Sequence, residues 1–283
     1  MSHPVLAPGK VAVVTGGASG IGLAAAKRFA ALGMRVAIAD LAGAKLTEAA
    51  AALAALAPGG SDDILPVPTD VSRPEEISRL ETTVRAALGP VALLMNNAGV
   101  QGGSALFGPF DAWEKVLAVN LMGVVHGSRV FAPAMIAAGE PGLIINTGSK
   151  QGITTPPGDP AYNVSKAGVK AFTEALQHDL RNTPNSKLSA HLLIPGFVFT
   201  GLTAKGRAEK PAAAWTPEQT VDFMFERLEA GDFYILCPDN DVPRALDEKR
   251  MQWAAGDIIE NRPPLSRWHP DYAEAFAKFV KGS

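Results

Sequence analysis

The sequence contains a single cysteine, Cys237, among its 283 residues. One cysteine cannot form a disulfide within the chain, which is consistent with a reducing compartment. Positive and negative charges nearly balance, with 26 Lys and Arg against 28 Asp and Glu. A net charge of −2 provides no basic surface of the kind that binds nucleic acid. We therefore expect neither a disulfide framework nor a nucleic-acid partner.

Long apolar runs are also missing. The longest apolar stretch, Ala49–Ala57, is much shorter than the roughly 20 residues that a membrane-spanning helix requires. The N-terminus has no basic segment followed by an apolar run, so no signal peptide is expected. His126 and His191 have no partners at metal-ligand spacing, so no metal site is expected. These absences predict a soluble, cytoplasmic protein without a membrane partner.

Short apolar runs alternate along the chain with longer helical patterns. The expected strands lie at 11–14, 35–40, 64–67, 91–95, 143–146, 188–194 and 233–236. The expected helices lie at 21–32, 41–57, 74–88, 111–138 and 161–181. This alternation predicts an α/β fold, a doubly wound parallel sheet of about seven strands with helices on both faces. Residues 1–240 are expected to form one domain that binds the cofactor and carries catalysis.

Residues 241–283 are predicted to form a helical C-terminal extension. Helical spacing and proline positions favour one helix over 243–260 and a second over 270–280. An apolar stripe that includes Phe276 and Phe279 runs along the second helix and calls for burial. We expect the extension to pack on its own domain or on a partner subunit, covering the substrate mouth or a subunit contact.

A glycine-rich loop, Thr15–Gly22, joins the first expected strand to the first expected helix. Its glycines allow a tight turn, and the helix N-terminus offers free N–H groups to a pyrophosphate. This context predicts a Rossmann-type dinucleotide site. A GxxxxGK[ST] loop is absent, which argues against nucleoside triphosphate hydrolysis.

Asp40 ends the second expected strand, where an acidic residue would bind the hydroxyls of the adenosine ribose. The same carboxylate would repel the 2′-phosphate of NADP, at a cost of about 4 kcal/mol for unit charges ~4 Å apart at an effective dielectric of about 20. Ser19 and Leu41 beside the expected pocket carry no charge. Arg35 lies roughly 16 Å back along the strand. The sequence therefore predicts NAD, with NADP disfavoured.

Tyr162 and Lys166 are one helical turn apart and share a helix face. A nearby ammonium favours the phenolate form of a tyrosine, so Tyr162 could take a proton from an alcohol or give one to a ketone. Ser149, at the end of the fifth expected strand, could hold the substrate oxygen.

Several motifs together resemble those of the classical short-chain dehydrogenases/reductases. They follow the family's order over about residues 9–237 and comprise the TGxxxGIG loop at 15–22, the NNAG at 96–99, Asn120, Ser149, the YxxxK at 162–166 and the PGxVxT at 195–200. The resemblance implies catalytic roles for Asn120, Ser149, Tyr162 and Lys166. In the family, the lysine also binds the nicotinamide ribose, and the asparagine supports a water-linked proton relay to it.

The resemblance also implies a set of cofactor contacts. These are Gly16, Ser19, Gly20, Ile21, Gly22, Asp40, Asp70, Val71, Asn97, Ala98, Gly99, Tyr162, Lys166, Pro195, Val198 and Thr200. Within this set, Asp70 and Val71 correspond to the adenine contact, whereas Val198 and Thr200 correspond to the segment that fixes the carboxamide.

The substrate pocket is less well marked in the sequence. Gln151, Ile153, Phe197 and Phe199 are candidate lining residues and would favour an apolar substrate. Lys150 is expected to be a solvated surface lysine. The sequence thus predicts an NAD-dependent oxidoreductase that interconverts a bulky or apolar secondary alcohol and its ketone, working as a homodimer or homotetramer.

Other readings stay open at this point. One is a cofactor-binding regulatory protein without turnover, although the Ser, Tyr and Lys positions are all filled. Another is a carbonyl reductase of the same family that uses NADPH. An epimerase or dehydratase of the extended branch and an enoyl reductase are disfavoured by the loop spacing and the YxxxK spacing, respectively.

Overall fold

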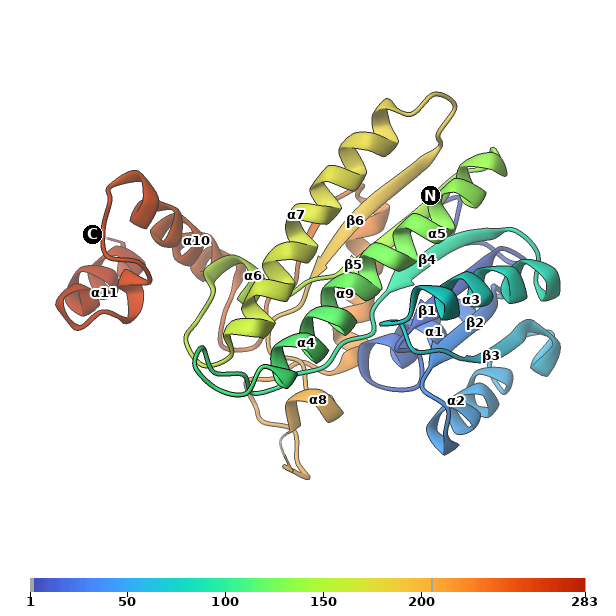
Figure 1. The fold of residues 1–283 in the computed structure, drawn as a ribbon, viewed down its shortest axis with the longest axis horizontal. Helices are drawn as coiled ribbons and strands as arrows, with labels where there is room; N and C mark the ends of the chain where they lie inside the picture. Colours follow the sequence, from blue (N-terminus) through green and yellow to red (C-terminus); the bar gives the residue numbers. More distant parts are fainter. Residues whose placement is uncertain (1–2, 205, 283) are drawn as a thin grey trace.

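A seven-stranded parallel sheet forms the centre of the computed structural model, which describes residues 3–204 and 206–282 (Figure 1). The strands are β1 (Val11–Thr15), β2 (Arg35–Asp40), β3 (Ile64–Pro68), β4 (Val91–Asn96), β5 (Gly142–Thr147), β6 (Leu188–Ile194) and β7 (Tyr234–Leu236). Their order across the sheet is β3-β2-β1-β4-β5-β6-β7, and every pairing is parallel. The predicted fold class is confirmed.

Helices cover both faces of the sheet, each over its own apolar core. One face packs against α1 (Gly20–Ala31), α2 (Ala44–Ala54) and α9 (Pro217–Glu229). The other packs against α3 (Pro74–Ala87), α5 (Gly123–Ala137) and α7 (Pro160–Asn182). All residues of β1, β4 and β5 are buried, as expected for strands covered on both sides.

The strand order reverses between β1 and β4, which are neighbours in the sheet. In doubly wound sheets, ligands bind in the crevice that this reversal opens at the carboxyl ends of the strands. Here β1 ends at Thr15 and β4 at Asn96, so the glycine loop and the NNAG segment both meet this crevice.

The helix predicted over 111–138 is interrupted. It consists of α4 (Asp111–Leu117), a π-helical turn (Ala118–Met122) and α5. The turn contains Asn120, whose side-chain amide pairs with the backbone of Val100: Nδ2 donates to the Val100 carbonyl at 2.9 Å, and Oδ1 accepts from the Val100 N–H at 2.7 Å. Single π turns inside α-helices are frequent at functional sites.

This interrupted helix, Asp111–Ala137, is long and apolar enough by length and composition to span a membrane. In the fold, apolar residues of this helix pack into the protein core: Phe131 and Met135 are buried against the sheet. Core helices of this kind commonly pass the same test, so the stretch is weak evidence for a membrane segment.

Three helices lie where none was predicted: α6 (Gln151–Thr154), α8 (Gly201–Ala204) and α9. The start of α9 is marked by a capping box in which the Thr216 hydroxyl accepts from the Gln219 N–H and the Gln219 side chain accepts from the Thr216 N–H. Pro217 occupies the first turn, where its missing N–H costs nothing. The sequence therefore held the signal for α9.

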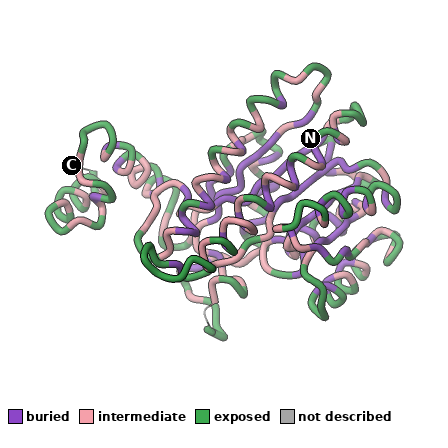
Figure 2. Tube along the Cα trace, viewed as in Figure 1, coloured by how far each residue is buried: buried purple, intermediate pink, exposed green. Residues whose placement is uncertain are grey.

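The C-terminal extension projects from the body of the molecule (Figure 1). It contains α10 (Arg244–Ile259), two 3₁₀ turns and α11 (Ala273–Lys281). Trp253 packs against Phe276 and Phe279, with ring centroids 5.3 Å apart in each pair. Most of the extension is exposed (Figure 2), and Ile258 is 86% exposed. Packing against a partner subunit stays a prediction.

Candidate active site

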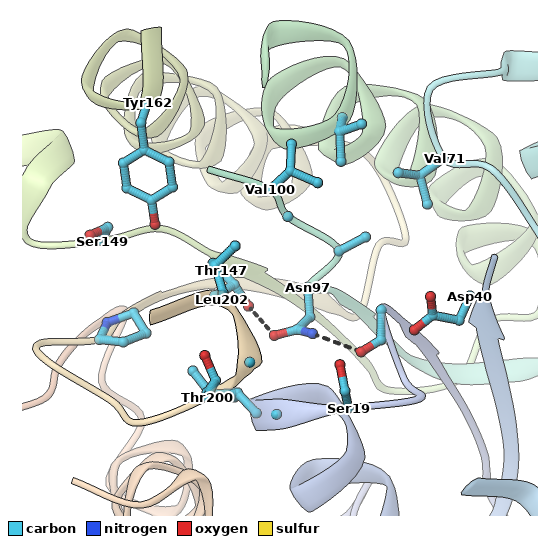
Figure 3. Close-up of a pocket in the computed structure, with 18 of the residues that line it drawn as sticks. Ser19, Asp40, Val71, Asn97, Val100, Thr147, Ser149, Tyr162, Thr200 and Leu202 are labelled. Carbon is cyan, nitrogen blue, oxygen red and sulfur yellow. Dashed lines mark hydrogen bonds between the residues drawn. The ribbon is translucent and has the colours of Figure 1, made fainter. Parts of the chain in front are cut away.

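A pocket of about 440 Å³ lies at the carboxyl ends of the central strands. Asp40 borders one end of it, and Ser149 and Tyr162 border the other (Figure 3). The residues between them come from the glycine loop, the NNAG segment and the segment around Thr200. The crevice expected from the strand order is thus present, with Ser149 and the ionisable Tyr162 at one end.

The glycine loop has the backbone that a dinucleotide site needs. Gly16 and Gly20 have φ values of +63° and +54°, which L side chains rarely adopt. A Cβ on Gly16 would lie 2.8 Å from the Ala98 Cα. Ser19, the N-cap of α1, lines the pocket and does not cap the helix with its side chain. The first turn of α1 can therefore donate N–H groups to a pyrophosphate, so these residues fit the predicted cofactor.

Asp40 is held at its end of the pocket by two backbone donors. Its Oδ2 accepts from the Ala18 N–H at 3.0 Å, and its Oδ1 accepts from the Leu41 N–H at 2.8 Å. Arg35 is engaged elsewhere, because its Nη1 donates to the Leu88 carbonyl at 2.6 Å. The acidic group is therefore fixed, and Arg35 is directed to the opposite end of β2.

Asn97 clamps the glycine loop to the neighbouring strands. Its Nδ2 lies 3.2 Å from the Thr15 carbonyl and 3.3 Å from that of Gly16, to which it donates. Thr147, at the end of β5, donates its hydroxyl to Asn97 Oδ1 at 3.4 Å (Figure 3). Asn97 thus links the glycine loop to the end of β5 along the pocket. Sequence spacing does not reveal these side-chain contacts.

Tyr162 and Lys166 lie on one face of α7, directed toward the end of β5. The Lys166 ammonium is 5.8 Å from the Tyr162 ring centroid and donates to the Thr147 carbonyl at 2.8 Å. Ser149 lies beside the Tyr162 hydroxyl, and its own hydroxyl accepts from the Gln151 N–H at 3.2 Å. The three residues therefore meet at one end of the pocket.

Burial dominates the ionisation of this pair. It raises the pKa of Tyr162, with the Ser149 hydrogen bond opposing the shift and the Asp159 charge adding to it. Burial also lowers the pKa of Lys166 to about 8. Both shifts favour the neutral forms in the cofactor-free protein, so the phenolate requires further positive charge or higher pH.

Asn120 is buried and does not line the pocket. A Cβ built on Gly99 would lie 3.5 Å from Asn120 Oδ1 and 3.9 Å from Lys166 Nζ. The two side chains therefore both lie close to Gly99. The water-linked relay between them stays a prediction.

The structure brings most of the predicted site residues to the pocket. Those that line it are Gly16, Ser19, Gly20, Ile21, Asp40, Asp70, Val71, Asn97, Ala98, Gly99, Ser149, Tyr162, Lys166, Pro195, Val198 and Thr200. Those that do not are Gly22, Asn120, Gln151, Ile153, Phe197 and Phe199. A Cβ on Gly22 would lie 2.2 Å from the Gly16 carbonyl oxygen, so this glycine serves close backbone packing.

The two phenylalanines miss the pocket because of strand alternation. The segment 197–199 is extended, and its backbone pairs with Trp215 through the Phe199 N–H and the Phe197 carbonyl. Neighbouring side chains on an extended segment point to opposite sides. Val198 lines the pocket, and the flanking Phe197 and Phe199 face away from it.

Ile153 borders a separate, small cavity shared with Met251 of α10, and Gln151 opens α6 beside Ser149. Sequence reasoning missed other lining residues: Thr69, Ser72, Val100, Lys115, Ala118, Val119, Thr147, Leu202 and Thr203 are among them. Lys115, Ala118 and Val119 are spaced as residues on one face of a helix, and this spacing could have indicated that they line the pocket together.

The C-terminal extension does not cover the pocket of its own chain, since no lining residue among the described ones lies beyond Thr203. The part of the chain that the structure describes also contains no cluster of His, Cys, Asp and Glu that could hold a metal ion.

Comparisons with known proteins agree with this geometry. A family model described as short chain dehydrogenase matches residues 10–211. The 1-deoxy-11-beta-hydroxypentalenate dehydrogenase of Streptomyces avermitilis is 33% identical over 248 residues, which cover 86% of this chain and 89% of that protein. The 2-(R)-hydroxypropyl-CoM dehydrogenase of Xanthobacter autotrophicus is 34% identical over 206 residues, covering 71% of this chain and 79% of that protein.

Solved structures give the same result. A short-chain dehydrogenase/reductase from Burkholderia phymatum, in complex with NAD, is 34% identical and superposes with a TM-score of 0.80, over 91% of this chain and 96% of that one. The residues matched by the family model, 10–211, include the glycine loop and the segment from Ser149 to Thr200. The chain therefore belongs to the classical short-chain dehydrogenase/reductase family of oxidoreductases.

Proposed function

We propose that this chain is an NAD-dependent oxidoreductase that interconverts a secondary alcohol and its ketone, with Tyr162 as the general acid/base. The observation that carries this proposal is the single pocket bordered by Asp40 at one end and by Ser149, Tyr162 and Lys166 at the other. These two ends match the two requirements of the reaction, cofactor recognition and proton transfer.

The residues of the pocket would hold NAD along its length. The first turn of α1 would bind the pyrophosphate, Asp40 the adenosine ribose hydroxyls, and Lys166 the nicotinamide ribose. When bound, the cofactor accepts or supplies the hydride. Ser19 and Leu41, which line the pocket together with Asp40, carry no charge, and this supports NAD over NADP.

The chain itself would orient the substrate oxygen and move its proton. The Ser149 hydroxyl would hold the substrate oxygen near the Tyr162 hydroxyl, and Tyr162 would take the alcohol proton in oxidation or return it in reduction. The buried Lys166 ammonium would favour the phenolate when charged. Positive charge on the oxidised cofactor would act in the same direction.

The substrate is proposed to be a secondary alcohol with apolar bulk. Val100 and Leu202 line the pocket and are apolar. The matched relatives, a hydroxypentalenate dehydrogenase and a hydroxypropyl-CoM dehydrogenase, are named for hydroxylated substrates. The two names share a hydroxylated substrate but differ in the molecule that carries the hydroxyl group. They therefore support the class of substrate and not a particular molecule.

The proposal is tested by screening linear, cyclic and aromatic secondary alcohols with NAD and NADP in parallel, following the absorbance of the reduced nicotinamide. We expect turnover with NAD that increases with the apolar size of the alcohol. Binding of NADH without oxidation of any alcohol or reduction of any ketone would instead indicate a regulatory protein.

The pH dependence of the two reaction directions follows from Tyr162. Because burial raises the pKa of its hydroxyl, the protonated form dominates near neutral pH. Oxidation needs the deprotonated form, so log(kcat/KM) for the alcohol is expected to rise with pH, whereas reduction needs the proton and is expected to slow. Both profiles are measured from about pH 6 to about pH 10. A flat oxidation profile, with a substrate deuterium isotope effect showing that hydride transfer limits the rate, would contradict this role.

The extension is proposed to contact a partner subunit in a homo-oligomer. Ile258 and Ile259 at the end of α10 are 86% and 81% exposed, and large apolar side chains grouped on a surface favour contacts. Changing both to Asp is expected to lower the oligomer size in sedimentation velocity. The matched exposed change, Glu248→Gln, should leave it unchanged. An unaltered oligomer in the double Asp variant would exclude this contact.

A further inference from the structure

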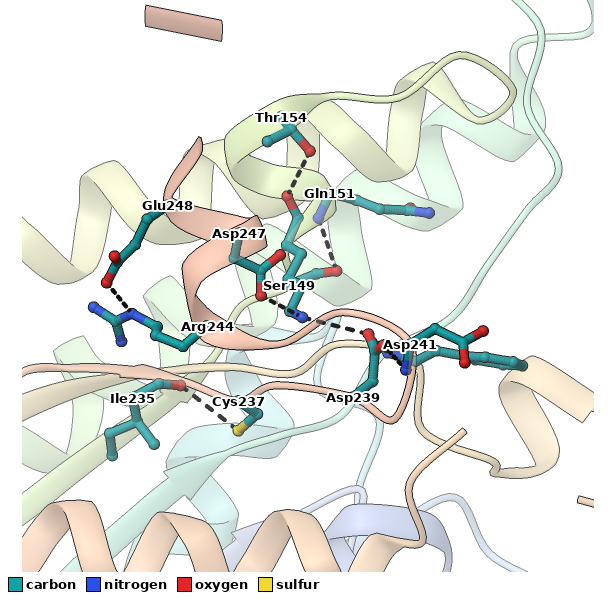
Figure 4. Close-up of polar contacts among 12 residues, drawn as sticks. Ser149, Gln151, Thr154, Ile235, Cys237, Asp239, Asp241, Arg244, Asp247 and Glu248 are labelled. Atoms are coloured by element: carbon teal, nitrogen blue, oxygen red, sulfur yellow. Dashed lines mark hydrogen bonds and ion pairs between the residues drawn. The ribbon is translucent and has the colours of Figure 1, made fainter. Parts of the chain in front are cut away.

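Lys150, the residue after Ser149, is one of three side chains in a largely buried ion-pair cluster. Its side chain is only 16% exposed, and its Nζ lies 2.5 Å from Asp247 Oδ2 and 3.3 Å from Asp239 Oδ2. Both carboxylates are 7% exposed. The expectation of a solvated surface lysine is therefore wrong, because the ammonium pairs with two acidic residues distant in sequence, Asp239 and Asp247, both labelled in Figure 4.

The cluster joins three separate segments. Lys150 stands at the start of α6, Asp239 follows β7, and Asp247 lies in α10 of the C-terminal extension. The Lys150 N–H donates to the Pro195 carbonyl at 3.2 Å, and Asp239 Oδ2 also accepts from the Phe197 N–H at 3.3 Å. Lys150 and Asp239 therefore hold together the residue next to Ser149 and the segment after β6.

Only one residue layer separates this cluster from the pocket. A Cβ on Gly196 would lie 2.6 Å from Asp239 Oδ2 and 2.9 Å from Lys150 Nζ. Gly196 itself lines the pocket, together with Pro195. The cluster therefore packs directly against Gly196, a residue that lines the pocket.

The ammonium also compensates two buried carboxylates. Burial raises the pKa of Asp247, and the contact with Lys150 opposes that shift. Removing one partner from a buried ion pair is costly because it leaves the other charge uncompensated. Arg250 also lowers the pKa of Asp247, but without the Lys150 ammonium Asp239 and Asp247 would repel each other across the space that it fills.

We propose that Lys150 is a positioning residue of the active site, which ties the Ser149 segment and the Pro195–Phe197 wall to Asp239 and to Asp247 of the C-terminal extension. This rests on the proposed function for its catalytic consequence, since Ser149 is there assigned to hold the substrate oxygen. The extension thus acts on catalysis through α10, although it does not line the pocket.

Three variants and a matched control test this role. Lys150→Met removes the ammonium, and Lys150→Met/Asp239→Asn/Asp247→Asn removes both carboxylates as well. Asp247→Asn alone keeps the ammonium beside Asp239. The control is Arg244→Met, which breaks an exposed ion pair with Glu248 in the same helix, 2.8 Å between Arg244 Nε and Glu248 Oε1.

Measurements are kcat and KM for the alcohol turned over best, the melting temperature, and amide hydrogen exchange of residues 195–199. We expect Lys150→Met to lower kcat by about tenfold or more, since small misplacements of reacting groups have large effects. The triple variant should recover part of the lost melting temperature but not kcat. It removes the repulsion between the two carboxylates, while the link that Lys150 makes between the segments is still missing. Exchange at the Phe197 amide should be faster in both, and Arg244→Met should match the wild type.

A role in stability alone predicts a different pattern. Folded Lys150→Met with kcat within about twofold of wild type, or kcat that recovers together with the melting temperature in the triple variant, would overturn the proposal. If Lys150→Met does not fold, Asp247→Asn decides: a lowered kcat with faster exchange supports the tether, and behaviour like Arg244→Met refutes it. Exchange requires no substrate, so a wild type without turnover refutes the proposed function while the tether is still tested.

Discussion

Replacing Tyr162 with Phe is expected to lower kcat by at least about 10²-fold, while NADH binds with an unchanged Kd. The substitution removes only the hydroxyl that would exchange a proton with the substrate. The ring keeps its packing against Val116 and Ala161, with which it forms a small buried cluster. Initial rates and NADH fluorescence titrations on the same preparation separate the loss of chemistry from a loss of cofactor.

The matched control is Tyr234→Phe. Tyr234 is 48% exposed, and its hydroxyl donates to Glu174 on the surface. Its removal should leave both kcat and Kd unchanged. If Tyr162→Phe kept more than about a tenth of the wild-type kcat, Tyr162 would not be the essential acid/base, and another donor in the pocket would have to be sought.

The second large effect concerns the cofactor. With NAD, kcat/KM is expected to exceed the value with NADP by about 10²-fold or more, because the fixed Asp40 carboxylate would face the 2′-phosphate. Asp40→Ala should reduce this ratio toward unity. It removes the repulsion, but it also removes the ribose contact and the hydrogen bond from the Ala18 N–H, so kcat/KM with NAD falls as well.

Arg35→Met serves as the control for cofactor choice. Arg35 donates to the Leu88 carbonyl and lies 3.7 Å from Asp63 Oδ1, away from the pocket. The variant should therefore keep the wild-type preference. A wild-type enzyme that prefers NADP, or a preference that depends on Arg35, would refute the assignment of Asp40.

Where backbone geometry dictates residue type, the sequence predicted the fold, and most of the residues named for the cofactor line the pocket. The glycine loop requires positive φ at Gly16 and Gly20, and the crevice follows from the strand alternation that sets the sheet order. Tyr162 and Lys166 are one turn apart on a single helix, so their shared face is a local property. These features depend on short stretches of chain.

Other features depend on contacts between distant segments and were missed. Phe197 and Phe199 were expected at the pocket because of their apolar character, but their backbone pairing with Trp215 directs Val198 there instead. Lys150 was expected in solvent because its partner Asp239 lies 89 residues away. The π turn contains Asn120, whose hydrogen bonds to Val100, 20 residues away, no helical period reveals.

The most direct test of the proposed activity follows the transferred hydrogen. A secondary alcohol that carries deuterium on the carbinol carbon is mixed with the protein and NAD, and the reduced cofactor is analysed by mass spectrometry. The account predicts that the reduced cofactor gains one deuterium in the wild type and that Tyr162→Phe forms it at a rate lower by at least about 10²-fold. No deuterated cofactor from any alcohol in the panel, despite measurable NAD binding, would contradict the proposed oxidoreductase activity.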